Sequence, residues 1–237
     1  MNGTVEIRIG DESIGSGFRM VKDDIIVTNS HILPPTPGDV PIRAVTPNDT
    51  ESELEVVDVS PEPRRDGHDY AILRAVDEIN QDCEVLQPAE KELNRGDTVW
   101  FAGYPFDISE PLVHTAIVSG THPHGFYFDG SVNYHNSGGP IVIDGDRVVG
   151  MVTKSEMYKS HSVEENIENL YGIQEKLTRV QDVHKTEINE IDIEGLAIDT
   201  IQEIQNAVDI LTDNVSSGIG VGYSIDPVLD ALKNIDM

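Results

Sequence analysis

Residues 135–152 read HNSGGPIVIDGDRVVGMV, the most informative stretch of the 237-residue sequence. A serine followed by two glycines and a proline leads into an apolar run, a turn at Asp144, Gly145 and Asp146, and a second apolar run. Glycines let the backbone turn sharply beside the Ser137 hydroxyl, with amide hydrogens directed at a reaction centre. The stretch therefore predicts a β-hairpin preceded by a candidate nucleophile.

A candidate base and a candidate carboxylate lie earlier in the chain. A serine hydroxyl is a poor nucleophile unless a base takes its proton, so both groups are expected. His31 follows the apolar run IIVTNS, and Asp69 opens the run DYAILRAV. Alone, either residue is usually structural. Together, the order His31, Asp69, Ser137 matches a triad whose members lie on two β lobes across one cleft.

Short apolar or alternating runs separated by turn residues extend from Val5 to about Val152. This pattern predicts a mainly β fold, either a barrel or a sandwich. Gly15 and Gly17 are expected to mark a hairpin. The boundary between two β lobes is expected near residues 87–94, where a proline and a short polar stretch interrupt the strands.

The apolar period changes between about Val163 and Val215, where apolar residues recur at three- and four-residue steps. This spacing predicts two amphipathic helices of about 25 residues, nearly coiled-coil in regularity. The turn between them is expected at residues 192–195, with Gly172 as a weaker break.

The chain returns to the β pattern in GIGVGYSI, from Gly218, and Asp226 with Pro227 is expected to start a short helix. The expected domains are a β domain formed by residues 1–155 and 216–237, and a helical insertion over residues 156–215. The apolar stripe of the insertion must be covered. Either its helices cover one another, or a second copy or a partner protein does so.

The charge composition is strongly acidic: 43 acidic and 16 basic residues give a formal net charge of −27. The acids are spread along the chain, which argues against nucleic acid or an anionic membrane as a partner. Spread acidity is typical of a surface solvated in molar salt, where screening removes self-repulsion, so we expect a salt-adapted (halophilic) protein. The alternative is an ordinary acidic protein with disordered segments, which the regular apolar patterning disfavours.

Cys83 is the only cysteine, so no internal disulfide is expected and the class of disulfide-stapled secreted proteins is excluded. We expect Cys83 to lie near the surface. The N-terminal residues MNGTVEIRIGDE contain no basic segment followed by an apolar run, and no window is apolar enough to span a bilayer. A cytoplasmic location is the expectation.

No cofactor or metal is expected. His122 and His124 form an H-x-H pair, but no third ligand at suitable spacing is evident, so a turn is the preferred interpretation. The G-x-G within residues 218–222 precedes a strand rather than a phosphate-binding helix, so a nucleotide site is not expected.

Several segments resemble trypsin-like serine proteases, most closely the protease domain of the HtrA branch. They are GSGFRMVKDDIIVTNSHIL from Gly15, HDYAIL from His68, DTVWFAGYPF from Asp97, FDGSVNYHNSGGPIVIDGDRVVGM from Phe128 and GIGVGYSIDPVLDAL from Gly218. The resemblance implies a chymotrypsin-like double β-barrel and hydrolysis of polypeptides through an acyl-enzyme. No segment resembles the peptide-binding PDZ domain usual in HtrA proteins.

The resemblance also assigns roles within the candidate site. It implies that His31 is the general base, that Asp69 orients it and that Ser137 attacks. The backbone amides of His135 and Ser137 would form the oxyanion hole. The family has glycine where this chain has His135 and proline where it has Tyr134. A side chain at position 135 can disfavour the required torsion, so a hole distorted at rest is one expectation.

Two further segments resemble substrate-binding elements of the family. Residues 151–155 resemble the strand that pairs with the substrate backbone, with Thr153 beneath Asp69. Residues 131–133 resemble the wall and floor of the primary specificity pocket, and since none is charged a small or medium apolar side chain is expected there. The implied substrate-binding residues are Ser131, Val132, Asn133, Met151, Thr153, Lys154 and Ser155.

The sequence leaves two function classes open. The complete triad favours a serine endopeptidase. His135 and the large insertion favour a catalytically silent module. Such a module would bind peptides or partner proteins through the cleft between the β lobes and through the helical insertion.

Overall fold

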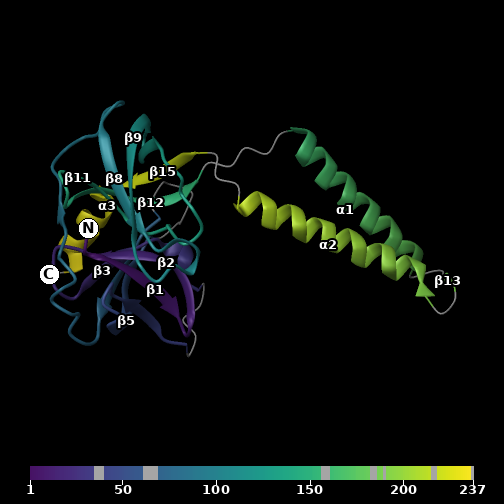
Figure 1. Ribbon diagram of the computed structural model, residues 1–237, viewed down its shortest axis with the longest axis horizontal. Helices are drawn as coiled ribbons and strands as arrows, with labels where there is room; N and C mark the ends of the chain where they lie inside the picture. The colour runs from purple at the N-terminus through teal and green to yellow at the C-terminus, as the bar shows by residue number, and fades with distance from the viewer. Residues whose placement is uncertain are drawn as a thin grey trace. The chain divides into compact units, whose positions relative to one another are not determined.

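The computed structural model describes residues 1–34, 40–60, 69–155, 161–181, 186–188, 191–214 and 218–235. The chain divides into two compact units, Met1–Glu156 with Ser216–Met237, and Met157–Val215 (Figure 1). The first unit holds the β strands predicted from the sequence, and the second holds the long helices. Within the described ranges, no helix is long and apolar enough to cross a membrane.

The first barrel is closed, with the strand order β1-β2-β3-β6-β5-β4. All of its neighbouring strands are antiparallel. Its strands are β1 (Thr4–Ile9), β2 (Glu12–Arg19), β3 (Ile25–Thr28), β4 (Ile42–Val45), β5 (Glu51–Val59) and β6 (Ala71–Ala75). Inward-facing side chains such as Val5, Ile7, Ile26 and Leu73 fill it.

The second barrel has the order β11-β8-β9-β10-β15-β12, and pairing of β11 with β12 closes it. Its strands are β8 (Thr98–Gly103), β9 (Leu112–His122), β10 (Gly125–Asp129), β11 (Pro140–Ile143), β12 (Arg147–Ser155) and β15 (Ile219–Ser224). The short strand β7 (Gln87–Pro88) lies parallel to β12. The prediction of a mainly β, chymotrypsin-like double barrel is confirmed.

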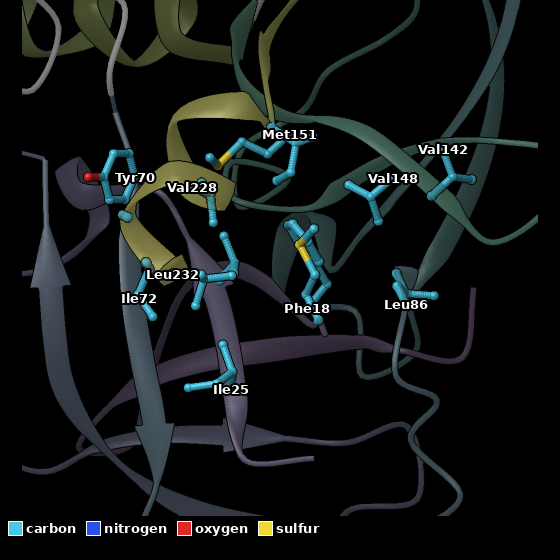
Figure 2. Packing of buried hydrophobic residues seen from close by; sticks show 14 residues of the cluster. Phe18, Ile25, Tyr70, Ile72, Leu86, Val142, Val148, Met151, Val228 and Leu232 are labelled. Carbon is cyan, nitrogen blue, oxygen red and sulfur yellow. The ribbon is translucent and has the colours of Figure 1, made fainter. Parts of the chain in front are cut away.

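A shared apolar cluster joins the barrels. Phe18 and Ile25 of the first barrel pack in one cluster with Val148 and Met151 of the second, and helix α3 (Asp226–Ile235) adds Val228 (Figure 2). All of these side chains are almost fully buried. Because burial of apolar area stabilises by about 25 cal/mol per Å², this cluster fixes the barrels against each other and so fixes a site built from both.

The glycines that were expected to mark a hairpin serve another purpose. Gly15 and Gly17 lie inside β2 rather than at a turn. A Cβ on Gly15 would come within 3.2 Å of the Ser137 carbonyl oxygen, so the absent side chain lets β2 approach the second barrel. The turn predicted after β11 is present, with left-handed φ values of 53° at Asp144 and 93° at Gly145.

The prediction for Cys83 was wrong. The side chain is 1% exposed and belongs to the core of the first barrel. Burial raises the pKa of the Cys83 thiol to about 11, since a thiolate would lose its hydration there. A single cysteine in a polar stretch carries no periodic signal of burial, and free cysteine is among the residues most often buried.

The helical unit contains α1 (His161–Gln181) and α2 (Ile193–Asn214). The expected turn position was wrong, because α1 ends at Gln181 and short strands β13 (Glu187–Ile188) and β14 (Ile191–Asp192) precede α2. Ile188 pairs with Ile191 across these strands. Apolar residues three positions apart are typical of a helix, but they also fit a pair of residues on the two sides of a tight turn, so the spacing was mistaken for a helix. Gly172 lies inside α1 and breaks nothing.

The two helices contact each other. Gln174 of α1 donates a hydrogen bond to Gln202 of α2 at 3.1 Å, and Ile201 and Gln205 of α2 are buried. Apolar side chains also remain exposed on both helices, including Tyr171 and Leu196. Part of the apolar stripe is therefore covered within the hairpin itself.

Candidate active site

The pairing of β3 with β6 brings His31 and Asp69 together. Thr28, the last residue of β3, pairs with Ala71, the first residue of β6. His31 lies just after β3 in the short 3-10 helix η1 (Ser30–Ile32), and Asp69 lies just before β6. In an antiparallel pair these flanking segments meet, and the His31 Nδ1 atom lies 2.6 Å from Asp69 Oδ2.

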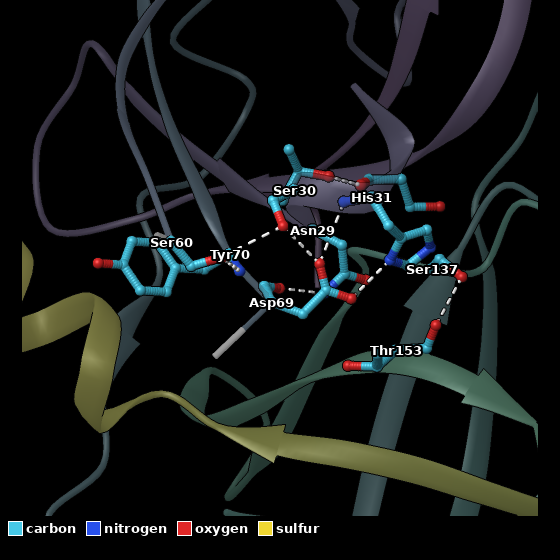
Figure 3. Close-up of polar contacts among 10 residues, drawn as sticks. Asn29, Ser30, His31, Ser60, Asp69, Tyr70, Ser137 and Thr153 are labelled. Atoms are coloured by element: carbon cyan, nitrogen blue, oxygen red, sulfur yellow. Dashed lines mark hydrogen bonds and ion pairs between the residues drawn. The ribbon is translucent and has the colours of Figure 1, made fainter. Parts of the chain in front are cut away.

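The Asp69 carboxylate is fully buried, and both of its oxygens are hydrogen-bonded. Oδ2 contacts His31 Nδ1, while Oδ1 accepts from the Ser30 hydroxyl at 2.7 Å and from the His31 amide at 3.1 Å (Figure 3). Burial acts to raise the pKa of Asp69, but the hydrogen bond and charge of His31, with the Ser30 bond, outweigh it and hold that pKa below its usual value. Asp69 is thus ionised at neutral pH, and His31 Nε2 is left as the basic nitrogen.

Sequence reasoning missed the polar residues that support this pair. Asn29 donates to the Asp69 backbone carbonyl at 2.6 Å, and Ser60 contacts the Ser30 hydroxyl at 3.3 Å. Asn29, Ser30 and Ser60 are all buried. The available signal was the polar pair Asn29 and Ser30 placed directly between a buried apolar strand and His31, since buried polar groups are almost always there to be hydrogen-bonded.

The loop that carries Ser137 is fixed to β12. The Gly138 amide donates to the Val152 carbonyl at 2.8 Å, and the Val152 amide donates to the Gly139 carbonyl at 2.9 Å. Gly138 has a φ of 84°, and a Cβ there would lie 2.1 Å from the Ser16 carbonyl oxygen. Glycine is therefore required directly after Ser137.

The structure brings Ser137 next to the His31 and Asp69 pair, as Figure 3 shows. The Ser137 hydroxyl donates a hydrogen bond to the Thr153 carbonyl at 2.9 Å. The proton of the hydroxyl is therefore directed at β12 rather than at the imidazole. Rotation about the Cα–Cβ bond of Ser137 would release the hydroxyl from Thr153.

His135 takes up a backbone conformation that favours glycine. Its φ is 71°, in the left-handed region, which costs a residue with a Cβ of the order of 1–3 kcal/mol. Its ring contacts that of Tyr134 at an interplanar angle of 38°, with 4.2 Å between centroids, and the Tyr134 carbonyl accepts from the Phe106 amide at 3.3 Å. The loop thus keeps a glycine-like torsion although its side chain disfavours it.

The predicted specificity-pocket residues lie in different environments. Val132 is 5% exposed and packs in the core of the second barrel, where a Cβ on Gly220 would come within 2.7 Å of it. Its side chain therefore does not line an open pocket. Ser131 is exposed and Asn133 is half-buried.

The predicted substrate-pairing strand is the second half of β12. The Met151 side chain is buried in the cluster between the barrels, and its backbone is paired with β11 on one side and β15 on the other. Lys154 and Ser155 pair with β15, and the pairing is irregular between Val152 and Lys154. Thr153, at this irregularity, has a buried hydroxyl with no hydrogen-bond partner among the described residues, so no bond to Asp69 is seen.

Within the described ranges, no group of three or more His, Cys, Asp or Glu side chains could hold a metal ion. His122 ends β9, and His124 precedes β10, so the H-x-H pair occupies the turn between these strands.

Comparison with known proteins places this geometry in a family. A model of the trypsin-like peptidase domain matches residues 15–151. Serine protease HTR4 of Rattus norvegicus is 31% identical over 157 residues, which cover 60% of this chain and 29% of that protein. A probable periplasmic serine endoprotease DegP-like of Rhizobium meliloti (strain 1021) is 31% identical over 156 residues, which cover 62% and 29%. The chain spans less than a third of the length of these relatives.

Solved structures agree in fold. The serine endoprotease from Yersinia pestis has a TM-score of 0.53 and 25% identity, covering 65% of this chain and 54% of that chain. The inactive form of the Rv3671c protease has a TM-score of 0.53 and 21% identity, covering 65% and 78%. The family match spans more than half of the sequence and includes His31, Asp69 and Ser137, so the chain belongs to the trypsin-like peptidase family and has relatives among the HtrA and DegP serine proteases.

Proposed function

We propose that this chain is a serine endopeptidase that hydrolyses peptide bonds through an acyl-enzyme. The observation that carries the proposal is the 2.6 Å contact between His31 and the buried Asp69, beside Ser137, in a member of the trypsin-like peptidase family. A binding module would gain nothing from a buried carboxylate that orients one imidazole beside one serine, because that arrangement serves to accept a proton.

The chemistry follows from the positions of these groups. Ser137 Oγ attacks the carbonyl carbon of the scissile bond, and His31 Nε2 takes the hydroxyl proton as the new C–O bond forms. Asp69 stabilises the imidazolium, and the amides of His135 and Ser137 stabilise the oxyanion. The C–N bond then breaks, the amine leaves with the proton from His31, and water hydrolyses the acyl-enzyme by the same steps.

Binding of the substrate would also redirect the Ser137 hydroxyl. An extended peptide that adds to β12 carries N–H groups along its edge, and the Thr153 carbonyl is an acceptor on that strand. When a peptide N–H takes this acceptor, the Ser137 hydroxyl is released to donate to His31 Nε2. The hydrogen bond from Ser137 to Thr153 is then a resting arrangement that an extended polypeptide replaces.

Labelling with a fluorophosphonate, followed by mass spectrometry, tests the proposal. Wild-type protein should gain one label on Ser137 and should degrade an unfolded protein substrate. Ser137→Ala should lose both properties and keep its melting temperature, with hydrolysis reduced by about a millionfold. The alternative is a silent peptide-binding module, favoured by His135 and the insertion. It predicts peptide binding without labelling, so a folded wild type that is never labelled contradicts the enzyme.

We also propose that the protein is adapted to high salt, because its net charge of −27 creates self-repulsion that only strong screening removes. The melting temperature should fall when sodium chloride is lowered from molar to physiological concentration. Sucrose at matched osmolality is the control, since it is excluded from protein surfaces but screens no charge. An unchanged melting temperature in salt, or equal protection by sucrose, contradicts the proposal.

A further inference from the structure

Ser16 lies in β2 of the first barrel and contacts the loop that carries the nucleophile in the second barrel. The residue is completely buried. Its hydroxyl donates to the His135 carbonyl at 2.7 Å and accepts from the Tyr104 amide at 2.9 Å. Its own amide donates to the Ser137 carbonyl at 2.9 Å. One residue therefore holds the carbonyls of both residues whose amides would form the oxyanion hole.

The surroundings of Ser16 leave its hydroxyl little freedom. Thr28 donates to the Ser16 carbonyl at 2.6 Å, which fixes the backbone from the other side. A Cβ on Gly103 would lie 2.9 Å from Ser16 Oγ, and one on Gly15 would lie 3.2 Å from the Ser137 carbonyl oxygen. A hydroxyl has one proton to donate, and here that proton is committed to the His135 carbonyl.

The hydrogen bond from Ser16 holds the part of the Ser137 loop that most needs a restraint from outside the loop. His135 has a φ of 71°, which its own Cβ disfavours, and such a conformation persists only when the surroundings impose it. Fixing the His135 carbonyl fixes the plane of the following peptide, and fixing the Ser137 carbonyl holds the far end of the same turn. We propose that Ser16 is a positioning residue that keeps the amides of His135 and Ser137 in oxyanion geometry, which rests on the proposed endopeptidase function.

Ser16→Ala is the direct test. It removes the donor to the His135 carbonyl and leaves the His31 and Asp69 pair intact. We expect kcat to fall by about tenfold to a hundredfold, the loss typical of a displacement of about 1 Å in a catalytic group. KM should stay at its wild-type value, because the substitution removes no group that binds substrate.

Ser52→Ala is the matched control. Ser52 is a buried serine of the same barrel whose hydroxyl has no hydrogen-bond partner in the described part of the chain. Its removal should leave kcat within about twofold, as expected when no bond is lost. Equal kcat values in Ser16→Ala and Ser52→Ala would overturn the proposal.

A double-mutant cycle with His135→Gly separates positioning from a purely structural role. Glycine adopts the left-handed conformation without an external restraint. Ser16→Ala should therefore cause a smaller fold-loss of kcat in the His135→Gly background than in wild type. The two fold-losses should differ by a factor of at least about three, since coupled sites are non-additive. The same fold-loss in both backgrounds would show that Ser16 only stabilises the barrel.

Amide hydrogen exchange gives a readout that needs no catalysis. The peptide over residues 134–139 should exchange faster in Ser16→Ala than in wild type or Ser52→Ala, and unchanged exchange overturns the proposal even if hydrolysis is never detected. Absent labelling of Ser137 in wild type would instead refute the proposed function alone. If Ser16→Ala does not fold, Ser16→Cys keeps a weaker donor and should give an intermediate kcat and exchange rate. Wild-type values in that variant contradict the inference.

Discussion

Asp69 in the first barrel and His135 in the second both belong to the candidate active site, but they are held by different kinds of contact. The Asp69 carboxylate is buried, and each of its oxygens is hydrogen-bonded to side chains or backbone within the first barrel. His135 is half-buried, has a left-handed torsion, and its carbonyl is held by a serine of the other barrel. The first half of the site is fixed by its own strands, and the second half by contacts across the barrels.

This difference indicates which part of the site can respond to a ligand. Changing the first half requires breaking a buried network, which is costly because charges would be left unpaired. Changing the second half requires only the rotation of the Ser137 hydroxyl away from the Thr153 carbonyl, or a shift of a strained loop. Substitutions at His31 or Asp69 should therefore abolish turnover, and substitutions at His135 or Ser16, which leave the Ser137 hydroxyl in place, should tune it.

Among substitutions that keep Ser137, the largest effect is expected for Asp69→Asn. An amide in place of the carboxylate leaves the shape intact but no longer fixes the imidazole with its proton on Nδ1, so kcat should fall by about 10⁴-fold. Steady-state hydrolysis of an unfolded protein measures the loss. Asp58→Asn is the control, because Asp58 lies in the same barrel and its carboxylate accepts a hydrogen bond from the Tyr70 hydroxyl rather than from a candidate catalytic residue. More than about a tenth of wild-type kcat in a folded Asp69→Asn protein contradicts the rigid first half.

A smaller effect of opposite sign is expected for His135→Gly. Restoring a lost oxyanion donor would raise kcat by about 10²- to 10³-fold. Because the torsion at position 135 is already left-handed, kcat should rise by less than about tenfold. Asp144→Gly is a matched control, since Asp144 also has a positive φ but lies in the hairpin turn after β11. Both variants should raise the melting temperature, and only His135→Gly should change kcat. A sharp fall in kcat of folded His135→Gly would show that the histidine side chain contributes to catalysis.

The same comparison explains what the sequence could predict. His31, Asp69 and Ser137 each lie beside a recognisable apolar run, and pairing of β3 with β6 brings His31 and Asp69 together. The role of Ser16 could not be found in that way, because its contact with His135 joins residues 119 positions apart on different barrels. The direction of the Ser137 hydroxyl was equally inaccessible, since a rotamer is selected by its neighbours.

Local ambiguity accounts for the other errors. Ile188 and Ile191 are spaced for a helix and equally for a cross-strand pair, so periodicity placed the end of α1 too late. Val132 was assigned to a pocket by resemblance, yet it is buried against the core. Side-chain direction at a loop position depends on tertiary packing, which no local pattern encodes.

A modest effect on stability should follow from the lowered pKa of Asp69. When a carboxyl group has a lower pKa in the folded state than in the unfolded state, its ionised form stabilises the fold. This contribution is complete at pH values well above the unfolded-state pKa of about 3.9, and it is lost as the pH falls through the folded-state pKa. The free energy of unfolding of wild type minus that of Asp69→Asn should therefore shrink as the pH falls below about 5. Urea titrations at each pH measure this difference in the free energy of unfolding. The contributions of the other carboxyl groups are present in both proteins and cancel in the difference. A constant difference would mean that the buried network does not stabilise the carboxylate.

The smallest effect is expected from removal of the helical unit. Ser155 of β12 pairs with Gly220 of β15, so the two ends of the insertion return to adjacent strands, about 4.8 Å apart. A linker of about four glycine and serine residues can join such strands, as in ordinary hairpin loops. Replacing residues 157–215 in this way should leave the melting temperature and kcat of the protease unit nearly unchanged, because its barrels have their own cores.

Light scattering measures the oligomeric state of the full chain and of the shortened chain. If exposed side chains such as Tyr171 and Leu196 pair with another copy, the full chain should be larger than a monomer and the shortened chain monomeric. A shortened chain that fails to fold would contradict the independence of the two units. A folded but inactive one would show that β12 depends on the insertion, and that the second half of the site is tuned from outside the barrels as well as by Ser16.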